Sequence, residues 1–126
     1  MKVSDKIYQE ELMDHYKFPR NRQKIKDPDF FADDGNITCG DKIHIEGKIE
    51  NNKITEIGFD GSGCVISQAA ASMLTEKVLG KTIDEVLALN KDDIIELLGI
   101  ELGPNRLKCA LLSLQVLKKG LSEFKE

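Results

Sequence analysis

Residues 42–64, KIHIEGKIENNKITEIGFDGSGC, contain the clearest structural pattern of this chain. Ile43, Ile45 and Ile49 are separated by polar residues and Gly47, and this period of two is typical of a strand with one buried face. Asn51-Asn52 comes next, and because asparagine tolerates positive φ the pair predicts a two-residue hairpin turn. The stretch therefore predicts two antiparallel strands that lead into a glycine-rich turn.

The return strand of this hairpin is expected to place Thr55, Ile57 and Phe59 on one face of the sheet. Ile54 is out of phase with these three residues, which suggests a β-bulge. From residue 65 the period becomes helical and stays so as far as Gly80. A long helix should therefore follow the hairpin directly.

Further helices are predicted on both sides of this core. Ser4 to Tyr16 reads as a short helix, whereas residues 20–38 are polar and turn-rich and predict a loop with at most a short strand. Three later helix starts carry capping or first-turn residues: Thr82 with Glu85, Asn90, and Pro104. The order predicts an α+β domain over residues 1–126, with helices packed on one face of a small, about three-stranded antiparallel sheet.

The composition excludes several function classes. The chain has 126 residues, a net charge of −4 and a pI near 5.3, which argues against nucleic acid or an anionic membrane as the main partner. No apolar run reaches the length of a membrane span, and the N-terminus lacks the features of a secretion signal. We therefore expect a cytoplasmic protein. The basic runs at residues 17–26 and 104–108 indicate either a solvated face or a docking surface for an acidic partner.

Three cysteines and one aspartate are the candidate site residues. In a strand, residues i and i+2 face the same way, so Cys39 and Asp41 should lie on one side. Cys64 follows the two glycines of GSG at the start of a helix, where the N–H groups and the helix dipole favour a thiolate. Cys109 lies in the first turns of the last helix, and a weaker form of the same reasoning applies to it.

Together these four residues form a complete ligand set for Zn²⁺ or for an iron–sulfur cluster. Their spacing matches no compact cysteine knuckle, so the residues alone leave it open whether they converge. The alternative is that Cys64 and Cys109 are small apolar helix residues. His44 shares its face with Glu46 and is expected to be exposed, and His15 is expected to be structural.

Several segments resemble the IscU/NifU N-terminal family of iron–sulfur cluster assembly scaffolds, including its SufU branch. The first, ELMDHYKFPRN (residues 11–21), is similar to the N-terminal helix of that family and its PRN exit. TCGD, GSGCVISQAAASMLTE and RLKCALL are similar, in order, to its three cysteine segments. The resemblance covers nearly the whole chain and implies a SufE/NifU-like fold.

The resemblance implies a metal site formed by Cys39, Asp41, Cys64 and Cys109. In this family such a site builds a [2Fe-2S] cluster from iron and from sulfur that a cysteine desulfurase delivers, and it also binds Zn²⁺. The cluster then passes to apo-proteins. This role is that of a scaffold rather than an enzyme. The alternative is a zinc-dependent sulfurtransferase of the SufU kind, and a third reading is a purely structural zinc site.

Two departures from the family pattern affect this assignment. Lys108 stands where IscU-type members carry histidine, and LGPNRLK (residues 102–108) replaces their LPPVK segment, which argues against docking of an Hsp70-type chaperone. Arg106 and Lys108 are similar to the SufU branch, yet the insertion typical of that branch is missing. Cys109 is the expected persulfide acceptor, because these two cations favour its thiolate. Oligomeric state is left open, including a cluster shared between protomers.

Overall fold

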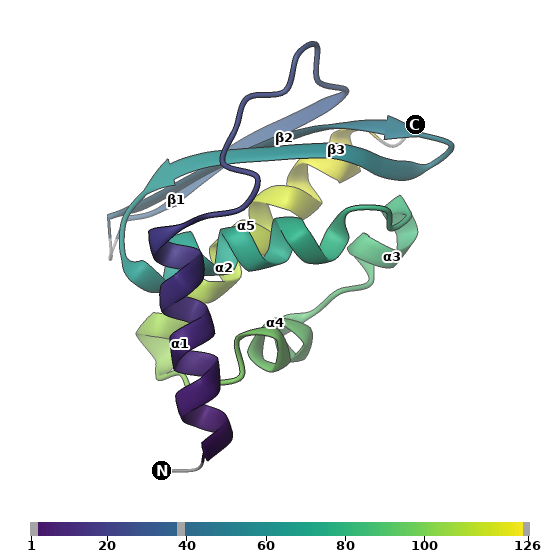
Figure 1. The fold of residues 1–126 in the computed structure, drawn as a ribbon. Coiled ribbons are helices and arrows are strands. Elements are labelled where there is room, and N and C mark those ends of the chain that lie inside the picture. Colours follow the sequence, from purple (N-terminus) through teal and green to yellow (C-terminus); the bar gives the residue numbers. More distant parts are fainter. Residues whose placement is uncertain (1–2, 38–39, 125–126) are drawn as a thin grey trace.

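The computed structural model describes residues 3–37 and 40–124 of the chain. Three strands form one sheet: β1 (Phe30–Asn36), β2 (Asp41–Glu50) and β3 (Lys53–Ser62). Five helices complete the order along the sequence: α1 (Val3–Lys17) before the sheet, then α2 (Val65–Val78), α3 (Ile83–Leu87), α4 (Lys91–Leu98) and α5 (Pro104–Phe124). The predicted α+β class is confirmed, and Figure 1 shows α2 and α5 lying along one face of the sheet.

The sheet is antiparallel in the order β1-β2-β3. Asn51 and Asn52 adopt φ values of 52° and 65°, so the predicted two-residue turn is confirmed. The register shifts after Lys48, which confirms the bulge that the phase of Ile54 suggested. The prediction for Thr55 is wrong, because this shift turns Ile54 into the core and leaves Thr55 exposed.

The segment predicted as a loop with at most a short strand contains β1, a strand of seven residues. Phe30 and Ala32 are buried and Phe31 between them is exposed, so the strand has one buried face. The alternation of buried and exposed residues is limited to the first three positions of the strand, because its last four residues are Asp-Asp-Gly-Asn. Pairing with β2, rather than β-propensity, accounts for the strand character of this second half.

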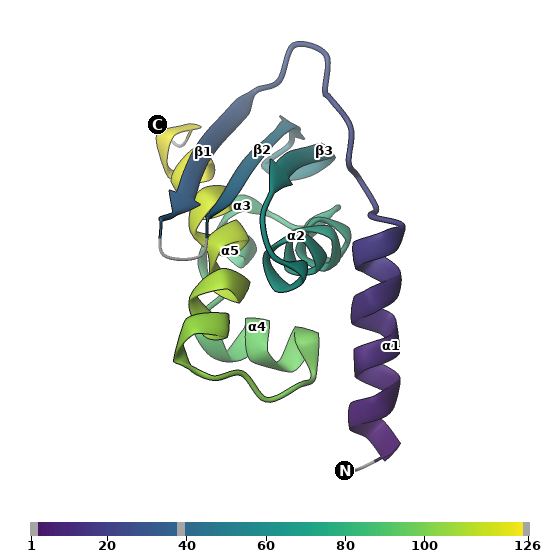
Figure 2. The same cartoon turned by 90° about the vertical axis from the view of Figure 1, so that its left-hand side faces the viewer.

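The core lies between the sheet and the two long helices. Ile45 and Phe59 project from the sheet and are fully buried, as are Leu74 of α2 and Leu117 of α5. In α2, every residue from Ile66 to Thr75 is buried. This helix has no solvent-facing side over that length because the sheet, α5 and α1 all pack against it. Figure 2 shows the sheet as one layer, α2 and α5 below it, and α1 at the side of the helical layer.

The short helices carry the predicted caps. Both Thr82 and Asn90 form complete capping boxes, with Glu85 and Asp93 as their partners. Gly99 ends α4 in the left-handed conformation, and α5 begins at Pro104 as expected. These caps satisfy the backbone groups at the helix ends, so short helices are stable in the connection between α2 and α5.

Two arginines of the basic run at residues 17–26 form ion pairs with acidic residues of the same chain. Arg20 forms an ion pair with Asp14, and Arg22 forms one with Asp60. The backbone of Asn21 accepts a hydrogen bond from the N–H of Phe59, so the segment also covers part of the outer edge of β3. Within the described residues, no helix has the length and apolar character needed to cross a bilayer.

The two histidines have opposite environments. His44 lies on the outer face of the sheet, with Nδ1 2.7 Å from Asp33 and Nε2 2.7 Å from Glu46. Burial favours a lower pKa for His44, but the hydrogen bonds to these two carboxylates outweigh it and raise the pKa above its usual 6.5. His15 is 5% exposed, and burial, helped by the charge of Arg20, lowers its pKa. The expectation that His15 is structural agrees with this burial.

We expect the two imidazoles to titrate on opposite sides of pH 6.5 in an NMR titration, His44 above and His15 below. A base with a raised folded-state pKa stabilises the fold fully below its unfolded pKa, and this stability is lost as the pH rises through the folded pKa. His44→Gln should therefore lower the free energy of unfolding by at most about 1 kcal/mol at pH 6, and by less at pH 8. An equal loss at both pH values would contradict the ion-pair role.

Candidate metal centre

Three of the four predicted ligands converge in the structure. One oxygen of Asp41 and the sulfurs of Cys64 and Cys109 all lie within 4.8 Å of one another. Each comes from a different element: Asp41 begins β2, Cys64 precedes α2, and Cys109 lies in the second turn of α5. Cys39, the fourth predicted ligand, lies outside the described residues. The question that the sequence left open is therefore answered for these three residues.

Cys64 is the N-cap of α2. Its backbone is extended, with φ −73° and ψ 165°, and its sulfur accepts a hydrogen bond from the Ser67 N–H at 3.4 Å. The Ser67 hydroxyl donates in turn to the carbonyl of Cys64 at 3.1 Å. The sulfur therefore lies at the positive end of the helix dipole, as the sequence predicted, in a position that stabilises negative charge.

Asp41 is the buried acid of this group, with 1% of its surface exposed. Its Oδ1 accepts the backbone N–H of Cys64 at 2.8 Å, and Oδ2 lies 3.8 Å from the Cys64 sulfur. Burial alone would raise the pKa of Asp41, but hydrogen bonds, chiefly from the Cys64 N–H and the side chain of Cys109, outweigh it and lower the pKa. The site therefore holds a carboxylate beside two sulfurs.

Gly63 makes room for this carboxylate. Its φ is +137°, and a Cβ at this position would collide with the carboxylate of Asp41. Because glycine has no side chain, the backbone at this position can lie directly against Asp41. The β3–α2 turn thus fits directly against one of the ligands.

Cys109 has a neighbour that the sequence did not reveal. The Asn36 side-chain amide donates to the Cys109 sulfur at 3.9 Å, and Cys109 is 3% exposed. Asn36 pairs with Asp41 in the β1–β2 ladder, so strand register brings it to the site. A correct prediction of β1 would have placed Asn36 beside Asp41, but nothing local marks it as a neighbour of Cys109.

The two cysteines open into a cleft of about 600 Å³ between α1 and the starts of α2 and α5. Ten residues line it: Gln9, Leu12, Met13, Cys64, Val65, Ile66, Ile100, Asn105, Arg106 and Cys109. Arg106 therefore shares the cleft with Cys109, whereas Lys108 is exposed and does not line it. Of the two cations predicted to act on Cys109, only Arg106 lies in this cleft.

The donor set fits a soft metal or an iron–sulfur core. Thiolates bind zinc, iron and iron–sulfur clusters well, and a carboxylate is a harder ligand that zinc and iron also accept. The buried half of the site holds the ligands in place, while the cleft gives access from one side. His44 does not belong to this group, since its two nitrogens are engaged by Asp33 and Glu46.

Comparison with known proteins assigns the chain to a family. The family model of the NifU-like N-terminal domain matches residues 7–126. The chain is 37% identical to the zinc-dependent sulfurtransferase SufU of Bacillus subtilis, over 94% of this chain and 92% of that protein. It is 36% identical to the iron–sulfur cluster assembly scaffold protein IscU 1 of Archaeoglobus fulgidus, over 94% of this chain and 76% of that protein.

Among solved structures, one similar to this chain is a putative iron–sulfur cluster assembly scaffold protein for the SUF system from Fervidobacterium islandicum. The TM-score is 0.77 at 29% identity, over 94% of this chain and 98% of that one. Fold and sequence identity thus agree with each other. The chain belongs to the NifU-like N-terminal domain family, to which the IscU and SufU proteins are related.

Proposed function

We propose that this protein is a scaffold for iron–sulfur cluster assembly, formed by a single domain over residues 1–126. Cys39, Asp41, Cys64 and Cys109 would hold a [2Fe-2S] cluster built from iron and desulfurase-derived sulfur, and the cluster would then pass to apo-proteins. The observation that carries the proposal is the buried Asp41 carboxylate within 4.8 Å of two cysteine sulfurs beside an open cleft. A binding site of this kind suits a cargo that must enter and leave.

The residues have separate tasks in this proposal. The cysteine sulfurs bind the cluster, and the harder oxygen of Asp41 weakens the site so that transfer remains feasible. Cys109 receives sulfur: its thiolate attacks the terminal sulfur of the desulfurase persulfide, a new S–S bond forms, and the donor leaves as a thiolate. The guanidinium of Arg106, which lines the same cleft, supports the anionic charge during this exchange.

The alternative is zinc-dependent sulfur transfer, in which the same ligands hold Zn²⁺ and one cysteine leaves the metal to accept sulfur. The similarity to the Bacillus SufU protein favours it.

The proposed partners follow from this chemistry. A cysteine desulfurase supplies the sulfur and apo iron–sulfur proteins receive the cluster, both in the cytoplasm, where thiols remain reduced. The segment at residues 102–108 differs from the chaperone-binding motif of IscU-type proteins, so the proposal includes no Hsp70-type chaperone.

Anaerobic reconstitution tests the proposal. The purified chain is incubated with ferrous iron, sulfide and reductant, and its absorption spectrum and metal content are measured. We expect a visible chromophore with iron and sulfide in the ratio of a [2Fe-2S] cluster. A protein that never forms a chromophore, retains zinc, and stimulates a desulfurase in the zinc form would instead be the sulfurtransferase.

Replacing the carboxylate should lengthen the lifetime of the cluster. In Asp41→Ala the hard oxygen is lost and three thiolates remain, so cluster transfer to an apo-ferredoxin should slow severalfold, as measured by the spectral change of the acceptor. Asp41→Asn keeps the shape and an acceptor for the Cys64 N–H, which separates the effect of charge from misfolding. Glu96→Ala, an exposed acid of α4, is the matched control. Unchanged transfer rates in both Asp41 variants would remove this role of the carboxylate.

Gly63→Ala should damage the site through Asp41. The added methyl group would collide with the carboxylate and force it away from the sulfurs, so Zn²⁺ affinity should fall by roughly tenfold to a hundredfold. A competition titration with a chromophoric chelator measures the affinity. Gly80→Ala is the control, because Gly80 also has a positive φ, +86°, but a Cβ there would meet nothing within 4 Å. Equal losses in the two variants would show that backbone strain alone is responsible.

A further inference from the structure

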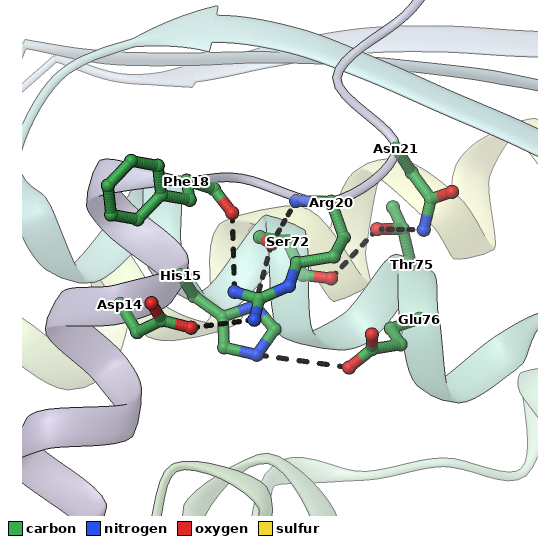
Figure 3. A network of polar contacts seen from close by, with 8 residues as sticks. All are labelled: Asp14, His15, Phe18, Arg20, Asn21, Ser72, Thr75 and Glu76. Carbon is green, nitrogen blue, oxygen red and sulfur yellow. Dashed lines mark hydrogen bonds and ion pairs between the residues drawn. The ribbon is translucent and has the colours of Figure 1, made fainter.

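The exit of α1 forms a polar network whose function the metal site does not explain. It joins residues 14–21, which include the PRN segment, to the middle of α2 (Figure 3). Arg20 donates from its guanidinium to Asp14 at 2.6 Å and to the carbonyl of Phe18 at 3.2 Å. Asn21 donates from its side chain to the hydroxyl of Thr75 at 3.2 Å. The network therefore fixes the direction in which the chain leaves α1.

Ser72 is the centre of this network. Its hydroxyl accepts the backbone N–H of Arg20 at 2.8 Å and forms a 2.7 Å hydrogen bond with Nδ1 of His15. Ser72 is fully buried and His15 is 5% exposed. Because a buried polar group without a partner is costly, these two bonds strongly favour one placement of α1 and its exit on α2.

Few apolar contacts hold α1 in addition to this network. The helix packs chiefly on α2, and among its residues 7–17 only Leu12 and His15 are buried. Tyr8 adds a contact beyond α2, since a Cβ on Gly99 would meet its ring. Figure 2 shows α1 standing apart from α5 and from most of the sheet. A helix attached in this way can separate while the rest of the core stays folded.

The position of α1 also determines one wall of the cleft. Gln9, Leu12 and Met13 face Cys64 and Cys109 across it. His15 lies one turn beyond Leu12 on the same helix, so the hydrogen bond to Ser72 fixes that wall close to the site. If α1 separated from α2, this side of the cleft would be lost.

We propose that Ser72, His15 and the backbone of Arg20 form a latch that holds α1 as a detachable wall of the cysteine cleft. These are positioning residues: they act on the site through α1 and not by contact with the metal. The importance of the cleft rests on the proposed function, but the latch itself is a property of the fold. Its release exposes Cys64 while the sheet, α2 and α5 remain folded.

Ser72→Ala in the full chain tests the latch, since the change removes one oxygen and leaves the Arg20 N–H and His15 without their shared partner. We expect amide hydrogen exchange in residues 7–17 to become roughly tenfold faster or more, with the strands unchanged. Alkylation of Cys64 in the metal-free protein, followed by peptide mass spectrometry, should accelerate in parallel.

Ser113→Ala is the matched control. Ser113 is also a fully buried helical serine, and its hydroxyl has no hydrogen-bond partner in the described part of the chain. The same chemical change there should leave α1 exchange at the wild-type rate. His15→Asn, which keeps a polar group near the position of Nδ1, should restore part of the protection that His15→Leu loses.

The proposal is overturned if Ser72→Ala leaves α1 exchange unchanged, if exchange rises equally in the strands, or if Ser113→Ala has the same effect. Exchange and alkylation do not depend on cluster assembly. A chain that shows the expected exchange but never forms a cluster would therefore count against the proposed function and not against the latch.

Discussion

The burial of α2 on every side links the sheet, α5 and α1 into one core. Over residues 66–75 this helix has no exposed face in the folded molecule, because the sheet, α5 and α1 all pack against it. Its polar side chains must then find partners inside the protein, which Ser72 does in the exit of α1 and Ser67 does at Cys64. The packing of α2 thus helps to determine where α1 lies and where the candidate metal ligands meet.

In the candidate metal centre, two of the three described residues lie at the ends of helices or strands. Asp41 starts a strand, Cys64 caps a helix, and the bond between the Asp41 carboxylate and the Cys64 N–H joins the sheet to α2. Removing this bond would weaken both the ligand set and the contact between two layers. Ligands held in this way change little in position, so the carboxylate stays beside the sulfurs while the cleft side remains accessible.

The sequence predicted those features that depend on neighbouring residues. The hairpin turn, the helix caps at Thr82 and Asn90, and the position of Cys64 at the start of α2 each follow from a short segment. Contacts between residues that are far apart in the sequence were not predicted. Asn36 reaches Cys109 through strand pairing, and Ser72 reaches Arg20 through helix packing. The error at Thr55 has the same origin, since the exact place of a bulge depends on the partner strand.

The two histidines make the stability of the fold depend on pH in opposite directions. His44 contributes less as the pH rises above 6.5, because its pKa is raised by Asp33 and Glu46. His15 lowers the stability of the fold as the pH falls below 6.5. Its pKa is lowered in the fold, so the unfolded chain binds the proton more readily. The combined contribution of the two histidines to the free energy of unfolding is therefore greatest near pH 6.5, the pKa that both have in the unfolded chain. His44 links β2 to β1, and His15 links α1 to α2. A rise in pH above 6.5 therefore weakens the contact between the strands, whereas a fall below 6.5 weakens the contact between the helices.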